Sequence, residues 1–146
     1  KRIRNANADL TARMSQPVAD QEQYRLFQTY QSSRHSGGDM SKMDYLDYQA
    51  LVEDTPIDTF LVKFRDAKGT LTGAMLADRL SDGLSAVYSY FDPEQPKRGM
   101  GTFMILWLIT EAKRLGLPRS ASGMSIPVLG GTTQLGHHLM LFDAMS

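Results

Sequence analysis

The chain has 146 residues, of which 42% are hydrophobic and 22% are charged, and its formal net charge is zero. These values are typical of one globular domain, and the zero net charge excludes a protein-wide positive field that would draw the molecule onto nucleic acid. The chain contains no cysteine, which excludes disulfides and thiolate metal sites, and its longest apolar run, 103–109, is far too short to cross a membrane.

Residues 1–19 are polar and begin with a basic cluster at Lys1, Arg2 and Arg4. We expect this segment to be an irregular basic connector. Asp20 is a good N-cap residue, so it predicts a helix that continues to about Arg34. Gln23 occupies the position that would complete a capping box with Asp20.

A glycine-containing loop follows at 35–39, and Ser41 is expected to N-cap a second helix with Asp44 in its first turn. Three strands are then predicted at 57–65, 70–80 and 83–90, because these segments are rich in alternating, β-branched and aromatic residues. Short turns separate them, so we expect an antiparallel meander.

The segment 101–115 predicts a helix that is apolar nearly all round its first two turns, which is typical of a buried helix. Gly116 favours its termination. We expect Trp107 and the methionine residues of the chain to lie in the core. The glycine turn before the helix leaves free backbone N–H groups, which suit an anionic or carbonyl-bearing ligand.

Several blocks of this sequence together resemble a known family. The blocks are Asn7-Ala8-Asp9-Leu10, the segment 24–40 with Arg34-His35-Ser36-Gly37-Gly38-Asp39-Met40, the segment 80–93 with Asp82-Gly83-Leu84-Ser85-Ala86-Val87-Tyr88 and Phe91-Asp92-Pro93, and the segment 101–118. They resemble the C-terminal domain of the bacterial arginyl-tRNA–protein transferase family, in particular its aspartate/glutamate leucyltransferase branch.

The resemblance implies an α+β fold of the GNAT acyltransferase type, with an antiparallel meander and a buried central helix, over residues 20–146. Members of the family carry a further domain with a cysteine cluster before this region. We therefore expect the present chain to be incomplete at both ends of the fold and inactive by itself.

The same resemblance implies the function. It predicts a cytoplasmic aminoacyl-tRNA–protein transferase that moves leucine from leucyl-tRNA onto proteins that begin with Asp or Glu, without a cofactor. The expected partners are aminoacyl-tRNA and the N-terminus of the acceptor protein, with no membrane. Two alternatives stay open: an N-acetyltransferase that uses acetyl-CoA, since the fold is shared, and a non-catalytic fragment or interaction module.

Two residues are candidates for catalysis. Asp92 follows the third strand directly, where a carboxylate would orient the amine nucleophile, although a turn aspartate before Pro93 is also common. Tyr88 is placed near the end of that strand, where its phenol would hold the ester carbonyl or donate a proton. A half-buried cross-strand tyrosine explains Tyr88 equally well.

The substrate-binding candidates come from two loops. Around the glycine turn they are Arg98, Gly99, Gly101 and Thr102, since Arg98-x-x-Gly101 resembles the pyrophosphate loop of GNAT enzymes; after the first helix they are Arg34 and His35. Helix termini account for both groups without a ligand. His137 and His138 stand without further ligands, so no metal site is expected.

The segment 119–138 departs from the family pattern, because small residues, glycines and Pro127 replace an aromatic strand. The residues 121–133 can be written as codons and translated in the frame that begins at the last base of the Ala121 codon. One permitted choice of codons then gives Leu-Gly-Tyr, Gly-Ser and Asp-Tyr at about the family's spacing. A reading-frame slip is thus one hypothesis, and true divergence is another. In either case we expect the sheet to lack the strand beside the third and to have an exposed edge there.

Overall fold

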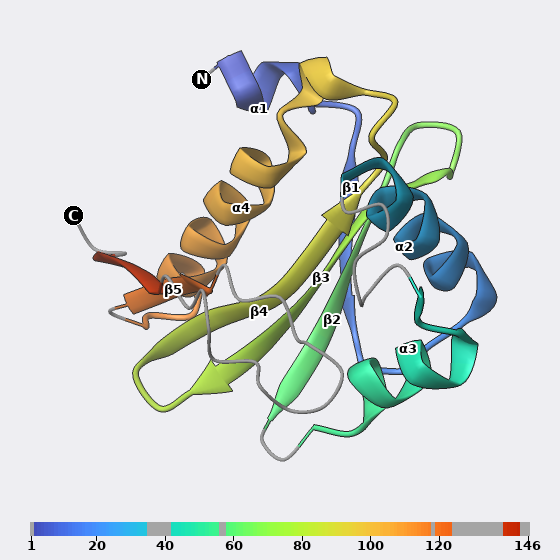
Figure 1. Cartoon of the computed structure of the whole chain (residues 1–146). Coiled ribbons are helices and arrows are strands. Elements are labelled where there is room, and N and C mark those ends of the chain that lie inside the picture. Colours follow the sequence, from blue (N-terminus) through green and yellow to red (C-terminus); the bar gives the residue numbers. More distant parts are fainter. Residues whose placement is uncertain (1, 35–41, 56–57, 118, 124–138, 144–146) are drawn as a thin grey trace.

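The computed structural model describes residues 2–34, 42–55, 58–117, 119–123 and 139–143 (Figure 1). The helices are α1 (Arg2–Ala6), α2 (Gln21–Arg34), α3 (Tyr45–Glu53) and α4 (Met100–Arg114), with a 3₁₀ turn, η2, at Pro96–Arg98; the strands are β1 (Thr11–Ser15), β2 (Thr59–Arg65), β3 (Leu71–Leu80), β4 (Gly83–Phe91), β5 (Arg119–Gly123) and β6 (Leu139–Asp143). In these ranges no helix combines the length and apolar character that a bilayer crossing requires.

The described strands form one six-stranded sheet in the order β1-β2-β3-β4-β5-β6, in which only the β4–β5 pair is parallel. The α4 helix packs on one face of the sheet, and α2 and α3 pack on the other (Figure 1). The predicted meander is confirmed, because β2, β3 and β4 pair antiparallel in succession. The α+β class is confirmed with it.

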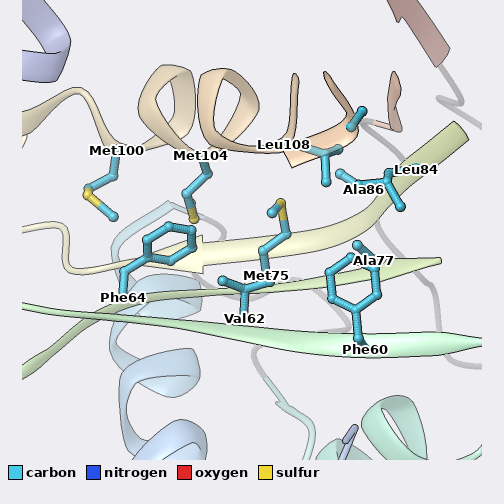
Figure 2. Packing of buried hydrophobic residues seen from close by; sticks show 11 residues of the cluster. Phe60, Val62, Phe64, Met75, Ala77, Leu84, Ala86, Met100, Met104 and Leu108 are labelled. Carbon is cyan, nitrogen blue, oxygen red and sulfur yellow. The ribbon is translucent and has the colours of Figure 1, made fainter. Parts of the chain in front are cut away.

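The face under α4 holds an apolar core built from alternate residues of β2, β3 and β4. Phe64 is completely buried here, and it lies edge-on to the rings of Phe103 and Trp107 at centroid distances of 5.9 and 5.8 Å. Figure 2 shows Met100 and Met104 of α4 reaching down to the strands beside Phe64. The expected core position of the methionines is thus correct for these two residues.

The burial of α4 is one-sided rather than complete. Its fully buried apolar residues recur every four positions, which marks a single face: Met100, Met104, Leu108 and Ala112. Phe103, Trp107 and Ile109 are only partly buried, although they pack against the same core. The predicted buried helix packed on the sheet is thus confirmed, and its deepest burial lies on the face that the sheet covers.

The opposite face of the sheet is covered by aromatic and amide side chains of α2 and α3. The hydroxyl of Tyr48 donates a hydrogen bond to Oε1 of Gln23 at 2.9 Å and also contacts the hydroxyl of Tyr90. Nε2 of Gln31 donates to the hydroxyl of Tyr88. All five side chains are buried, so this layer is held by paired polar groups as well as by ring packing.

A bulge in β4 decides which face its tyrosines occupy. Leu76 pairs with Tyr88 while the next residue, Ala77, pairs with Ala86, so Val87 is an extra residue in the ladder. The extra residue changes the phase of the alternation. Ala86 therefore belongs to the core under α4, whereas Tyr88 belongs to the layer under α2 and α3.

The helix starts differ in detail from the expected ones. Asp20 caps α2 as predicted, because its Oδ1 accepts from the Gln23 amide at 2.8 Å, but the Gln23 side chain turns into the core instead of completing a capping box. The N-cap of α3 is Asp44, which forms a capping box with Asp47. The sequence analysis placed Asp44 within the first turn of this helix, with Ser41 as the N-cap. Ser41 lies outside the described residues.

Two expectations about the ends of the chain were also wrong. Residues 1–19 are not irregular throughout, since Thr11–Ser15 pair with Leu61–Arg65 as β1. The sheet does not end at the third predicted strand either, because Arg119–Ser122 pair in parallel with Gly83–Ala86. The rest of the divergent segment, 124–138, lies outside the described residues.

Candidate functional site

A hollow of about 330 Å³ lies at the N-terminal end of α4, where three segments distant in sequence meet. It is lined by the end of α2, the end of β4 with the loop that follows, and the first turn of α4: Ser33, Arg34, Phe91, Pro93, Gln95, Pro96, Gly99, Met100, Gly101 and Thr102. The hollow thus brings together four of the predicted substrate-binding residues, namely Arg34, Gly99, Gly101 and Thr102.

The shape of the glycine turn depends on Gly99. Its φ of 59° lies in the left-handed region that favours glycine, and it is the N-cap of α4. A Cβ on Gly99 would stand 2.6 Å from Cδ1 of Ile3. The turn therefore favours glycine for its backbone angle, and a larger residue would also displace the Ile3 side chain.

The hollow has a positive character. The guanidinium of Arg34 lies over the rings of Tyr30 and Phe91, at 5.4 and 5.8 Å from their centroids, at one wall. At the other wall no side chain caps the N-terminus of α4. A helix start offers free amides and a partial positive charge, and no carboxylate is among the described lining residues. The arrangement suits an anion or a carbonyl oxygen.

A second hollow of about 500 Å³ adjoins the first, with Pro96 and Gly99 in both linings. Its other lining residues are Arg2, Ile3 and Lys97. Two further cations thus stand beside the glycine turn.

Tyr88 does not reach the hollow. It lies in the middle of β4, 6% exposed, beneath α2 and bonded to Gln31. Burial raises the pKa of its phenol well above the ordinary range. The expected position of Tyr88 near the site is not met, because Tyr88 precedes the last residue of β4 by three positions and is not among the lining residues of the hollow. The structure gives Tyr88 the packing role that was its alternative interpretation.

Asp92 lies directly after β4, as expected, but both of its carboxylate oxygens accept hydrogen bonds from its own loop. Oδ1 accepts from the Glu94 amide at 2.9 Å, and Oδ2 accepts from Nε2 of Gln95 at 2.8 Å. The loop is thereby folded by Asp92. The carboxylate is not among the lining residues of the hollow, and its catalytic role stays a prediction.

Arg98 turns away from the hollow towards the N-terminal segment. Its Nη1 and Nη2 donate to the two carboxylate oxygens of Asp9 at 2.8 and 3.0 Å, and its Nε donates to Gln95 at 2.6 Å. The hydrogen bond from Arg98 lowers the pKa of Asp9. The sequence pattern missed this pairing, although the Asn7-Ala8-Asp9-Leu10 block was visible. His35 lies outside the described residues.

The sequence interpretation also missed Phe91 and Gln95 as lining residues. Phe91 continues β4 one residue beyond the predicted end, and Gln95 stands three residues after Asp92, a spacing that permits the contact observed here. Neither residue carries a chemical signature of its own. Only their position beside the glycine turn could have indicated them.

Comparisons with known proteins identify relatives over most of the chain. The family model described as "Arginine-tRNA-protein transferase, C terminus" matches residues 22–128. A protein named aspartate/glutamate leucyltransferase from Paramagnetospirillum magneticum is 58% identical over 118 residues, covering 81% of this chain and 48% of the relative. One of the same name from Gluconobacter oxydans is 48% identical over 127 residues, covering 87% and 53%. The chain therefore spans about half the length of these relatives.

Several acetyltransferases are among the solved structures with a similar fold. The PaiA N-acetyltransferase of Thermoplasma acidophilum, solved in complex with coenzyme A, has a TM-score of 0.58 at 10% identity and covers 91% of this chain and 99% of that structure. The ribosomal-protein-S18-alanine N-acetyltransferase of Escherichia coli has a TM-score of 0.54 at 11% identity, covering 84% and 70%. These likenesses establish the GNAT-like fold.

Proposed function

This chain belongs to the family of C-terminal domains of arginine-tRNA–protein transferases. We therefore propose that it is the acyl-transfer domain of an aminoacyl-tRNA–protein transferase. The group transferred is leucine, taken from leucyl-tRNA, and the acceptor is the α-amino group of a protein that begins with Asp or Glu. The name shared by relatives at 58% and 48% identity supports this choice of donor and acceptor.

The reaction is aminolysis of an ester. The lone pair of a neutral α-amino nitrogen attacks the carbonyl carbon of the leucyl ester, and a C–N bond forms. The bond from that carbon to the ribose oxygen then breaks, and the amine proton ends on the released ribose hydroxyl. The step requires placement of the two reactants and stabilisation of the negative charge that develops on the carbonyl oxygen. No redox or group-carrying cofactor enters this balance.

The observation that carries the proposal is the hollow at the start of α4. The free amides of Gly101 and Thr102 are donors for the developing oxyanion or for a phosphate of the acceptor end. Arg34 supplies a charge at the opposite wall, within reach of a second phosphate. Arg2 and Lys97 continue the positive surface along the adjoining hollow, where the RNA backbone would leave the site.

We give Tyr88 no part in this scheme, because its hydroxyl is buried, is bonded to Gln31 and is not among the groups that line the hollow. Deprotonation of the amine is left to water or to Asp92, and the role of Asp92 as an amine-orienting group remains part of the proposal. His35 is a further candidate for tRNA contact from the loop that follows Arg34.

Binding by the chain itself tests the proposal. We expect the chain to bind leucyl-tRNA with marked salt dependence and not to bind acetyl-CoA at micromolar concentration. Replacement of Arg34 by glutamine should weaken the tRNA complex about tenfold to a hundredfold, because a charge-assisted contact is worth about 1.5–3 kcal/mol. Filter binding for tRNA and calorimetry for acetyl-CoA provide the measurements.

The matched control is Arg25→Gln, which removes an exposed arginine from the same helix, away from the hollow. It should leave tRNA affinity within about twofold. Equal losses in both variants would place the tRNA elsewhere on α2. Binding of acetyl-CoA without tRNA binding would favour the acetyltransferase alternative, and binding of neither would favour an interaction module.

A further inference from the structure

A continuous network of hydrogen bonds joins the N-terminal segment to the loop that follows β4. It runs from Asp9 through both terminal nitrogens of Arg98, from Nε of Arg98 to Oε1 of Gln95, and from Nε2 of Gln95 to Asp92. Residues 9 and 98 are 89 positions apart in sequence, so the network is a tertiary contact and not part of one turn. We call these four side chains the Asp9–Asp92 network.

A buried asparagine reinforces the same junction. Asn7 is 2% exposed, and its Nδ2 donates to the carbonyl oxygen of Arg98 at 2.7 Å and to that of Ile3 at 2.9 Å. Ile3 in turn packs against Gly99, where it leaves no room for a Cβ. The backbone of the glycine turn is thus held by the N-terminal segment.

From these contacts we propose that Asp9 and Arg98 are positioning residues that fix the glycine turn of the hollow, and that Arg98 is not a phosphate ligand. The functional half of this inference rests on the proposed function. Gln95 and Gly99 belong both to this junction and to the lining of the hollow, so a displacement of Arg98 moves groups that would face the substrate.

The donor count of Arg98 supports the assignment. Its Nε and Nη2 each have a partner within 3.0 Å, and Nη1 donates to Asp9 with further weak contacts to Asn7 and the Ala6 carbonyl. A planar guanidinium has five N–H donors in a fixed fork. A phosphate could take the paired Nη1 and Nη2 donors of Arg98 only by displacing Asp9, which would release the N-terminal segment from the turn.

Substitution of Asp9 separates a positioning role from a ligand role. If Arg98 positions the turn, Asp9→Asn should weaken leucyl-tRNA binding severalfold, in the same direction as Arg98→Ala. If Arg98 instead binds a tRNA phosphate and Asp9 competes for its guanidinium, then Asp9→Asn should tighten leucyl-tRNA binding, because it removes a negative charge and frees the guanidinium. Tighter binding would overturn the proposal.

The salt dependence of binding provides a second readout. Arg98→Ala should leave the slope of log K against log salt unchanged, since no phosphate contact is lost. Loss of one phosphate contact would reduce the slope by about 0.7 for single-stranded RNA and contradict the proposal. The double variant Asp9→Asn/Arg98→Ala should bind no more weakly than either single variant, because the two residues act as one unit.

Hydrogen exchange on the free chain tests the network without any substrate. The Phe103 amide, which donates to the Gly99 carbonyl at 2.9 Å, should exchange at least tenfold faster in Arg98→Ala and in Arg98→Lys, since lysine cannot reproduce the fork. The control is Arg65→Ala, which removes an equally bidentate pair with Glu22, at 2.7 Å for both contacts, on the other side of the sheet. It should leave Phe103 exchange unchanged.

The hydrogen-exchange result also tests the positioning role of Arg98 independently of the proposed function. If the unaltered chain fails to bind leucyl-tRNA, the proposed function fails, while faster exchange at Phe103 still supports the network. Exchange that is equal in Arg98→Ala and Arg65→Ala would overturn the positioning role whatever the tRNA result.

Discussion

Replacement of Phe64 by alanine is expected to lower the free energy of unfolding by about 3–5 kcal/mol. The side chain is fully buried in the core under α4 and touches two aromatic rings of that helix edge-on, so its removal costs apolar burial and leaves a cavity between helix and sheet. A domain of this size has a total stability of about 5–15 kcal/mol, so the variant would stand close to unfolding.

Urea denaturation followed by the fluorescence of Trp107, the single tryptophan, measures this loss. Leu46→Ala is the control, because Leu46 is 70% exposed and its truncation should change stability by no more than about 0.5 kcal/mol. Similar midpoints for the two variants would mean that Phe64 does not carry the packing of α4 on the sheet.

Raising the pH above 10 is expected to destabilise the protein by about 1–4 kcal/mol per pH unit. Burial raises the pKa values of Tyr48, Tyr88 and Tyr90 above the ordinary value of about 10. The contribution of these phenols is fully present below pH 10. Above it the unfolded chain releases their protons while the folded chain retains them, so stability falls until the folded pKa values are reached. Each tyrosine contributes about 1.4 kcal/mol per pH unit.

Unfolding free energies from urea titrations at pH 8, 10 and 11 give the slope. In Tyr88→Phe the decline should be smaller, because one of the buried titrating phenols is gone; the value at pH 8 corrects for its lost hydrogen bond with Gln31. An unaltered decline in this variant would show that the buried phenols do not cause the alkaline loss. Ionisation of the three buried tyrosines should appear together with unfolding.

Much of the fold follows from local patterns that the sequence displays openly. The three strands of the meander are predicted within one or two residues, because turns such as Asp66–Gly69 separate alternating segments. The end of α4 is equally plain, since Gly116 stands at its C-terminus with a φ of 75°. These features depend on neighbours in the chain, which a single sequence contains.

The errors arise where a distant contact decides the outcome. Nothing around Val87 indicates an extra residue in the ladder, since its effect depends on the register against β3; Tyr88 was therefore assigned to the wrong place. The Thr11–Ser15 strand looks polar, but pairing with β2 and the packing of Met14 on the core make it a strand.

The same difference between local patterns and distant contacts decides which residues of the candidate site could be predicted. The glycine turn and Arg34 could be identified from sequence, because each has a local chemical character and the resemblance points to both. The pairing of Arg98 with Asp9 could not, because the chain must fold before two residues this far apart meet. A charged residue in a loop looks like a ligand in sequence until its counter-ion is known.

The position of β1 matters for anyone who shortens the chain. The family match begins at residue 22, whereas the strand that borders β2 ends at Ser15. A truncation at the family boundary would leave β2, whose first four residues are buried, as the outermost strand with a free row of backbone donors and acceptors. Such edges recruit strands from other molecules. With β1 in place, the strand at this edge of the described sheet is short, carries Arg13 at its centre and ends before Pro17, features that oppose pairing with strands of other molecules.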